Sequence, residues 1–396
     1  MRLNSVFADL HIHIGRTESH LPVKITAARN MTFEQIVRES YHRKGIQMIG
    51  IIDAQSPPVQ EEIRRGLRSG LYKEHPDGGI VYRETTCILG AEIEIKEPGM
   101  GAAHVLCYFP TLERISRFTE WLGQHMKNVQ LSTQRLYRPA SSLQEKVAEL
   151  DGILIPAHVF TPFKSVYGSA TDRMGKLLDL DGVAGVELGL SSDSTLADHL
   201  SELERFTFVT NSDAHSLAKI GREYNELMVK EASFTELKFA LYRQEGRKVA
   251  ANYGLDPRLG KYYRTRCLQC QQLWPADPEI RCCPNCGSEK KVKGVRDRIM
   301  DIADRELCHP AHRPPYIYQV PLEFIPKLGK KTLDHLLAAF GTEMNVLHHV
   351  PLDDIARTAN REIARQIGLA REQRLELEEG GGGVYGKVKS SKPNEG

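Results

Sequence analysis

The stretch Asp9-Leu10-His11-Ile12-His13, near the start of the chain, decides the fold. It completes a run of apolar and β-branched residues that begins at Val6, which is typical of a strand. Residues two apart in a strand face the same side, about 7 Å apart, so the imidazoles of His11 and His13 would converge on one point. Imidazole is a common ligand of metal ions in proteins. By itself this motif is a weak signal, and it predicts a metal centre only together with residues further along the chain.

Ligand-type side chains recur at the other predicted strands, which are expected at residues 48–53, 87–95, 103–109, 152–158, 182–190 and 206–215. These side chains belong to Asp53, Glu92, His104, His158, Asp213 and His215. Isolated buried charges are strongly unfavourable, so this many ionisable groups at one rim would need a cation. Mixed imidazole and carboxylate ligands suit Zn²⁺ or Mn²⁺, and a carboxylate such as Glu92 can bridge two ions. The alternative is that these are ordinary polar residues at strand ends.

Helical patterns separate most of these strands, at residues 33–45, 112–126, 142–150 and 195–206. Strands that alternate with helices predict an α/β fold with a parallel sheet. About seven such units are enough to close a parallel (β/α) barrel, whose catalytic residues would lie at the C-terminal ends of the strands. An open, doubly wound sheet is the alternative, because periodicity does not reveal whether a sheet closes.

A centre with several metal ions suits the hydrolysis of phosphate esters. Such a centre lowers the pKa of a bound water toward neutrality and neutralises the charge of a phosphate. We expect Asp213 and Glu92 to act in catalysis at the metals and Arg222 to clamp a phosphate. Lys164 also follows a motif residue closely enough for such a clamp, although an ordinary surface charge explains either cation equally well. Glu187 and Asp193 are expected to support the ligands from behind.

The chain resembles the polymerase-and-histidinol-phosphatase, or PHP, superfamily in six motifs that occur in order within residues 5–250. The motifs are DLHIH (9–13), IID (51–53), GAEIE (90–94), AHVL (103–106), PAH (156–158) and NSDAH (211–215). The resemblance implies a distorted α/β barrel with a phosphoesterase site that holds two or three metal ions. Carried over by position, it implies these ligands: His11, His13, Glu92, His104, His158, Asp213 and His215.

The second motif departs from the family pattern. Family members usually have an acidic residue followed by histidine there, whereas this chain has Asp53-Ala54. Asp53 is still expected among the ligands, but the missing histidine leaves the number of ions open between two and three. A further ligand of the first motif would be either Glu18 or His20, and the sequence does not decide between them.

Four cysteines follow the predicted barrel in a C-x₂-C…C-x₂-C arrangement: Cys267, Cys270, Cys283 and Cys286. Two such turns can present four thiolates tetrahedrally, which predicts one structural Zn²⁺ ion in a ribbon. Cys282 adjoins the third position, but the turn sequence CPNCG favours Cys283. A closed four-thiolate site has no open position for a substrate, so we expect the ribbon to serve folding and recognition.

Basic and aromatic residues flank the ribbon and recur at a C-terminal hairpin. Residues 258–298 hold ten basic and four acidic side chains, which suits a polyanionic partner. Residues 324–341 resemble a helix-hairpin-helix element, which points the N–H groups of a helix start at a DNA phosphate, although Lys327 stands where the first hairpin glycine is usual. The expected DNA-binding residues are Tyr262, Tyr263, Arg264, Lys290, Lys291, Gly329, Lys330 and Lys331. The alternatives are tyrosines that pack the ribbon against the barrel and a plain pair of helices.

The order of these parts resembles the endonuclease Q family of DNA repair enzymes over nearly the whole chain. The expected division is a PHP metal-dependent phosphoesterase domain (1–252), a zinc ribbon (253–300), a small helical domain (301–379) entered by a proline-rich linker (309–321), and a mobile, Gly-rich basic tail (380–396). The resemblance implies hydrolysis of the phosphodiester 5′ to deaminated bases (uracil, hypoxanthine) and abasic sites, in double-stranded or single-stranded DNA. The alternatives are a small-molecule phosphatase of the histidinol-phosphatase kind and a DNA-binding protein without catalytic activity.

The composition excludes several classes of protein. The 396 residues are 41% hydrophobic and 26% charged, close to a globular average, which argues against wholesale disorder and a fibrous architecture. No apolar run approaches the roughly 18 residues of a membrane span, and the start lacks the apolar stretch of a signal peptide. We expect a cytoplasmic protein that makes no membrane contact and acts as a monomer, with a replication sliding clamp as a further candidate partner.

Overall fold

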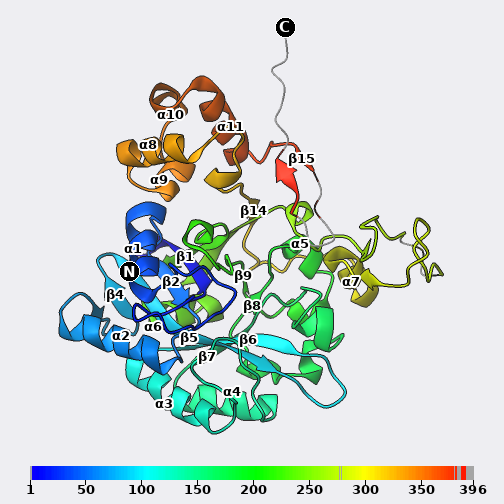
Figure 1. Cartoon of the computed structure of the whole chain (residues 1–396), viewed down its shortest axis with the longest axis horizontal. Helices are drawn as coiled ribbons and strands as arrows, with labels where there is room; N and C mark the ends of the chain where they lie inside the picture. Colours follow the sequence, from blue (N-terminus) through cyan, green and yellow to red (C-terminus); the bar gives the residue numbers. More distant parts are fainter. Residues whose placement is uncertain (1, 276, 278, 379, 381–384, 389–396) are drawn as a thin grey trace.

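Seven strands form a barrel in the computed structural model, which describes residues 2–275, 277, 279–378, 380 and 385–388. In order around the ring they are β1 (Asn4–Ile12), β2 (Met48–Ile51), β5 (Thr85–Ile95), β6 (Ala103–Phe109), β7 (Ile153–Pro156), β8 (Val186–Glu187) and β9 (Phe208–Val209) (Figure 1). The Ala184 N–H donates to the Leu154 carbonyl and so joins the β8 segment to β7. The ring closes where Ala214, beyond β9, pairs in parallel with Ile12 of β1. The predicted α/β barrel is confirmed, and the open sheet is not formed.

One barrel strand runs against the others. β1, β2 and β5 are parallel to one another, whereas β6 is antiparallel to both β5 and β7. The predicted parallel arrangement of the distorted barrel therefore does not extend to β6. Only residues 96–102 join β5 to β6, and a parallel crossover needs a dozen residues or more. The reversal brings His104, at the start of β6, opposite Glu94 near the end of β5.

A bulge in β1 sets the direction of its last side chains. Between Asp9 and Ile12, three steps along β1 match two steps along β2. Leu10, which lies within this bulge, is fully buried in the barrel core. His11 and His13 then face the rim at which the parallel strands end. Bulges commonly re-aim side chains beside functional sites in this way.

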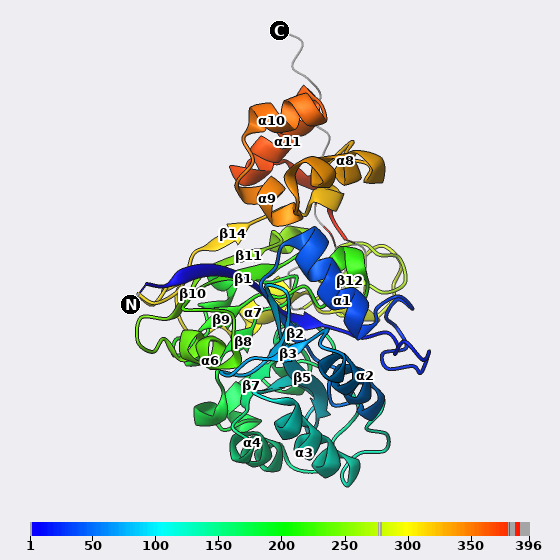
Figure 2. The same ribbon diagram turned by 90° about the vertical axis from the view of Figure 1, so that its left-hand side faces the viewer.

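Helices pack on the outside of the barrel (Figures 1 and 2). They are α1 (Phe33–Glu39, continued by a π-helical turn at Ser40–Lys44), α2 (Pro57–Arg68), α3 (Leu112–Gly123), α4 (Ala140–Glu149) and α6 (Phe234–Tyr242). α3 illustrates why they form, since its buried residues Leu112, Ile115, Phe118 and Leu122 recur at the three- and four-residue spacing of one helical face. The short strands β3 (Lys73–Glu74) and β4 (Ile80–Tyr82) edge the sheet beside β5.

Three strands extend the sheet beyond the barrel. β10 (Tyr224–Val229) pairs antiparallel with the first part of β1, β11 (Lys248–Gly254) pairs antiparallel with β10, and β14 (Tyr316–Tyr318) pairs in parallel with β11. β14 lies inside the proline-rich segment 309–321. That segment was predicted to be a linker, and the prediction is wrong because the segment adds a strand to the sheet.

The same segment interrupts a predicted helix. The helix expected at 195–206 is reduced to α5 (Ser194–Ala197) and a single 3₁₀ turn at Ser201–Leu203. Between these two pieces, the fully buried carboxylate of Asp198 accepts hydrogen bonds of 2.7–3.1 Å from Arg313. This contact ties the proline-rich segment down on the barrel.

Two smaller parts follow the barrel along the chain. β12 (Arg266–Cys267) and β13 (Lys291–Val292) pair in the ribbon, and α7 (Val295–Ile302) follows them. The helices α8 (Lys330–Phe340), α9 (Glu343–His348), α10 (Leu352–Thr358) and α11 (Arg361–Arg371) lie on the opposite side of the barrel from α3 and α4 (Figure 2). β15 (Leu377–Glu378) pairs with β16 (Lys387–Val388) in a short hairpin. Within the described part of the chain, no helix has the length and apolar character needed to cross a membrane.

Candidate metal-dependent active site

Seven of the predicted ligands lie together at one rim of the barrel. They are His11, His13, Glu92, His104, His158, Asp213 and His215, and we call them the histidine–carboxylate cluster. They come from the C-terminal ends of β1, β5, β7 and β9, or from the residues just beyond, and from the start of the reversed strand β6. The barrel therefore gathers side chains that are far apart in the sequence.

Glu92 lies at the centre of the cluster. Its Oε1 is 2.9 Å from His104 Nδ1 and 3.3 Å from His158 Nε2. Its Oε2 is 3.6 Å from His13 Nε2, and Asp213 Oδ1 is 3.5 Å from the same nitrogen. Donor atoms at these separations are close enough to share a metal ion.

The cluster divides into three groups of donors, and the ligand atoms of each group lie within 4.8 Å of one another. The groups are His11, His13 and Glu92; His13, Asp213 and His215; and Glu92, His104 and His158. His13 and Glu92 each belong to two groups, which is the arrangement that adjacent ions require. Among the described residues, the buried His11 Nε2 has no hydrogen-bond partner, and a cation would satisfy it. The donor set therefore fits divalent metal ions.

Nearby cationic groups favour the ionised form of both carboxylates of the cluster. Burial opposes ionisation of Glu92, but His104 and Lys24 hold its pKa well below the ordinary value. Burial also opposes ionisation of Asp213, and His11 lowers its pKa well below the usual range. Anionic oxygens placed among imidazole nitrogens are the donors that a divalent ion prefers.

Two further buried carboxylates hold the ring nitrogens that face away from the cluster. The Glu187 oxygens lie 3.0 and 3.1 Å from His11 Nδ1, and Asp53 Oδ2 lies 3.0 Å from His13 Nδ1. Such pairs set the tautomer and orientation of a ligand imidazole. The sequence predicts Asp53 as a ligand, but its carboxylate lies behind His13 and also accepts the Ile14 N–H at 2.8 Å. The structure therefore gives Asp53 an orienting position instead.

Three other candidates lie outside the cluster. Asp193 caps α5 by accepting a backbone N–H at 2.7 Å. Neither Glu18 nor His20 belongs to a donor group, so among the described residues neither supplies the further ligand of the first motif. Sequence reasoning missed Lys24, whose ammonium lies 3.3 Å from Glu92 Oε2, because no motif marks the loop that carries it.

Two cluster residues have a left-handed backbone conformation. The φ angles are 46° at Asp213 and 31° at His158. This conformation costs roughly 1–3 kcal/mol for most residues other than glycine and less for aspartate and asparagine, and it persists where neighbouring contacts enforce it. Beside Asp213, the Ala214 N–H donates to the His11 carbonyl and the Ala214 carbonyl accepts the His13 N–H. These bonds lock the Asp213 carboxylate against β1.

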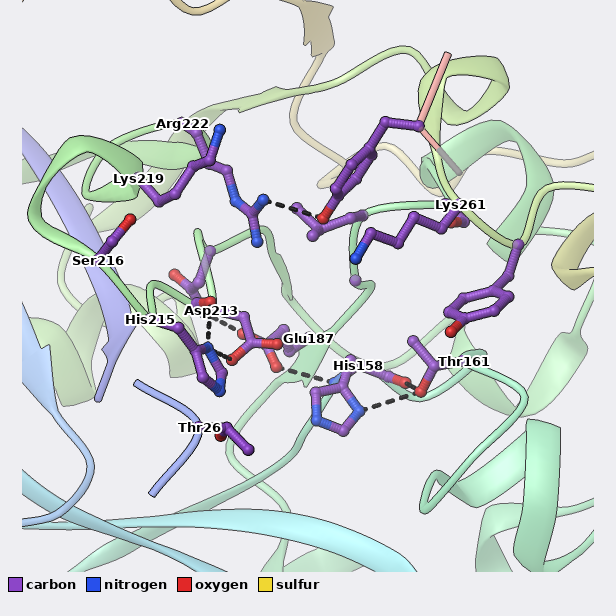
Figure 3. A pocket seen from close by; sticks show the side chains of 16 residues that line it. Thr26, His158, Thr161, Glu187, Asp213, His215, Ser216, Lys219, Arg222 and Lys261 are labelled. Atoms are coloured by element: carbon purple, nitrogen blue, oxygen red, sulfur yellow. Dashed lines mark hydrogen bonds and ion pairs between the residues drawn. The ribbon is translucent and has the colours of Figure 1, made fainter. Parts of the chain in front are cut away.

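A cavity of about 500 Å³ opens over the cluster. Figure 3 shows Lys219, Arg222 and Lys261 across this cavity from His158 and His215. The Lys219 ammonium is ion-paired with Glu323 at 2.6 Å, so Arg222 and Lys261 are the cations that suit an anionic group at the cluster.

The two cations predicted to clamp a phosphate differ in position. Arg222 is buried, lines the cavity and donates through Nε to the Ser212 carbonyl at 2.7 Å. Lys164 is about half exposed and lies 2.9 Å from Glu94 Oε2, outside the cavity lining. Only Arg222 is placed to meet a ligand at the cluster.

The four predicted cysteine ligands also meet. The Sγ atoms of Cys267 and Cys286 are 3.6 Å apart, and those of Cys270 and Cys283 are 3.5 Å apart. Zn–S bonds of about 2.3 Å in a tetrahedron place sulfurs about 3.8 Å apart, so the spacing fits one Zn²⁺ ion. Cys282 is exposed and outside the group, which leaves Cys283 as the third member.

The residues that flank the ribbon make more contacts within the protein than the sequence indicates. Tyr262 lines the cavity, and the Tyr263 carbonyl accepts an N–H from the first turn of α7. Arg264 is ion-paired with α7, and Lys291 lies over the ring of the ribbon tryptophan. Lys290 is exposed. Tyr262 thus borders the site and packs against Phe163 of the barrel domain, whereas Tyr263 is bonded through its carbonyl to α7.

The helix-hairpin-helix prediction holds for its second half. α8 begins after Gly329, and Lys330 and Lys331 are exposed in its first turn. Lys327 has a φ of 67°, the left-handed conformation that the usual glycine adopts easily. A single 3₁₀ turn at Leu322–Phe324 precedes the hairpin, so the expected first helix is absent from the described residues there.

Comparisons with known proteins place the chain in a family. No protein-family model matches it. An uncharacterized protein of Bacillus subtilis, YqxK, is 49% identical over 390 residues, which cover 98% of this chain and 100% of that protein. The crystal structure of the lesion-specific endonuclease PfuEndoQ from Pyrococcus furiosus has a TM-score of 0.85 and 32% identity, and the match covers 98% of this chain and 96% of that one.

A second solved structure agrees with the first. It is a complex of Endonuclease Q with a 27-mer duplex that has an abasic lesion at the active site, and it also has a TM-score of 0.85 and 32% identity. The match covers 98% of this chain and 97% of that chain. Over almost its whole length, this chain belongs to the endonuclease Q family.

Proposed function

We propose that this protein is a metal-dependent DNA repair endonuclease that cuts the phosphodiester on the 5′ side of a damaged nucleotide. The observation that carries the proposal is the histidine–carboxylate cluster at the base of a cationic cavity. Two overlapping donor positions, His13 and Glu92, and the facing Arg222 make a site for a phosphate between metal ions and a guanidinium. The damaged nucleotides are those with deaminated bases (uracil, hypoxanthine) and abasic sites.

The cluster would hold two or three divalent ions (Zn²⁺, Mn²⁺ or Mg²⁺), and the four cysteines would hold one structural Zn²⁺. Ions at the cluster would supply charge neutralisation at the phosphate and an acidified water as the nucleophile. The protein's own groups orient the reaction. Glu187 fixes the imidazole of His11, and Asp53 fixes that of His13. Arg222 offers N–H groups to a phosphate oxygen.

Extrusion of the damaged nucleotide would bring its 5′ phosphate to the cluster. The cavity volume of about 500 Å³ lies within the range of small-molecule sites. Flipping a nucleotide costs a few kcal/mol and least at a mispaired or missing base, so U·G pairs, I·T pairs and abasic sites would enter most readily.

DNA is the proposed partner outside the cavity as well. Lys330 and Lys331, in the first turn of α8, and the exposed Lys290 of the ribbon are available for phosphate contacts. We propose that residues 1–252, 253–300, 301–379 and 380–396 act as the catalytic domain, ribbon, helical domain and tail of a monomer. Recruitment by a replication sliding clamp is a further proposal.

Incision of defined duplexes tests the function. End-labelled duplexes that carry one uracil, one hypoxanthine, one abasic site or no lesion are incubated with the protein and Mg²⁺ or Mn²⁺. The proposal predicts a nick 5′ to each lesion and none in the undamaged duplex. Equal cutting of all four duplexes, turnover of small phosphate esters alone, or binding without cleavage would contradict it.

A further inference from the structure

The C-terminal hairpin returns to the active site. The Gly380 N–H donates to the Arg258 carbonyl at 2.6 Å, and the Gly386 N–H donates to the Leu259 carbonyl at 2.9 Å. A Cβ atom at Gly386 would lie 2.9 Å from the Leu259 Cα and would also collide with the Glu378 carbonyl oxygen, so only glycine fits this approach. These residues of the predicted Gly-rich tail therefore contact Arg258 and Leu259, while 381–384 and 389–396 lie outside the described part.

This docking carries Tyr385 into the wall of the cavity over the cluster. The Arg222 Nη1 donates to the Tyr385 hydroxyl at 3.0 Å. The Arg222 guanidinium carbon lies 5.8 Å from the centre of the same ring, and the Lys261 ammonium lies 4.6 Å from it. One tyrosine side chain thus contacts two of the three cations that line the cavity.

Tyr385 completes the anchoring of Arg222. At its Nε, the guanidinium is bonded to the Ser212 carbonyl, one residue before Asp213 of the cluster. At its Nη1, it is bonded to Tyr385. A guanidinium has five N–H donors in one plane, so two fixed bonds set that plane and leave three donors for a ligand. Arginine donates to phosphate best when this plane matches the two oxygens, and a free side chain would first have to be ordered.

We propose that Tyr385 is a positioning residue for incision, which holds Arg222 in the orientation that receives the phosphate at the cluster. The inference rests on the proposed function and adds to it a residue from the far end of the chain. The phenol hydroxyl acts through Arg222, and the ring face supports Lys261. The C-terminal hairpin is accordingly part of the active site.

A double-mutant cycle tests this inference. Tyr385→Phe keeps the ring and removes the hydroxyl, and Arg222→Ala removes the group it holds. Single-turnover incision of an abasic duplex is measured for the full-length wild type, both single variants and the double variant, because that substrate has no base for the ring to contact. Tyr242→Phe, on the half-exposed end of α6, is the matched control. Melting temperatures confirm that all the variants fold.

We expect Tyr385→Phe to slow incision about 10- to 150-fold when Arg222 is present, the range for losing one hydrogen bond to a charged group. In the Arg222→Ala background the same change should have an effect below about twofold, because residues that act together are not additive. Arg222→Lys serves as the background if incision by Arg222→Ala falls below detection. Equal effects in both backgrounds, or no effect of Tyr385→Phe, would overturn this inference alone. A wild type that does not cut damaged DNA would overturn the proposed function and this inference together.

Discussion

Glu187→Gln should weaken metal binding although it leaves every cluster ligand in place. Glu187 Oε1 accepts from Asn211 Nδ2 at 2.9 Å, and Oε2 accepts from the His158 N–H at 2.8 Å. Both oxygens also face His11 Nδ1. A glutamine has one oxygen and one NH₂ group. Its NH₂ group would therefore face one of these N–H donors and could not accept a hydrogen bond from it. Asn211 cannot turn to relieve this, since its Oδ1 accepts the Leu10 N–H at 3.0 Å.

The size of the effect follows from burial. His11 is fully buried, so water cannot replace the lost acceptor. A hydrogen bond to a charged group contributes about 1.5–3 kcal/mol, and loss of such a supporting group typically weakens metal affinity or activity about 10- to 100-fold. We expect the Mn²⁺ concentration for half-maximal incision to rise by that factor, with less metal retained after dialysis.

Asp193→Asn is the matched control for this prediction. Asp193 is a buried carboxylate six residues further along the chain, but it caps α5 and accepts from the Tyr318 hydroxyl at 2.7 Å, away from the cluster. Its variant should keep wild-type metal dependence. If Glu187→Gln kept wild-type metal content and metal dependence, the reasoning about His11 would be refuted.

Two further predictions concern the ribbon and a buried acid. Cys270→Ser should reduce the zinc content by about one ion per chain and lower stability or DNA affinity, because three thiolates and a hydroxyl no longer close the site; an unchanged zinc content and melting curve would count against the ribbon. Burial raises the pKa of Glu223, which accepts from Thr210 and Leu255, to about 8. The folded state therefore keeps this proton after the unfolded state has lost it, so wild-type stability should fall as pH rises from about 5 to 8, by up to about 1.4 kcal/mol per pH unit relative to Glu223→Gln. If the free energies of unfolding of the two proteins changed with pH in the same way across this range, the raised pKa of Glu223 would be excluded.

The sequence predicts the chemistry of the site better than its geometry. Histidine and acidic residues at strand ends are local signals in the sequence. The C-x₂-C…C-x₂-C spacing of residues 267–286 is also local, because each pair of cysteines lies on one tight turn that can supply two ligands of a tetrahedral site. The ribbon could therefore be predicted from its motif alone, whereas closure of the barrel and the set of seven cluster residues are implied by the resemblance to the PHP superfamily.

The remaining features depend on contacts between distant residues. The bulge in β1 and the reversal of β6 set which side chains face the rim, and neither leaves a mark in hydrophobic periodicity. Asp53 resembles a ligand in the sequence, and only its 3.0 Å contact with His13 Nδ1 reveals the orienting position. Tyr385 lies in a glycine-rich stretch that composition assigns to a mobile tail, while its hydroxyl is bonded to Arg222.

The most direct test of the central claim is incision of a single-uracil duplex by the wild type and by Asp213→Asn, measured beside DNA affinity. Asparagine tolerates the left-handed backbone of residue 213, so the substitution removes the anionic donor with little strain. A lesion-specific nick by the wild type, with no nick but unchanged DNA binding by the variant, is the predicted result. Retained cleavage by Asp213→Asn would contradict a catalytic metal centre at the histidine–carboxylate cluster.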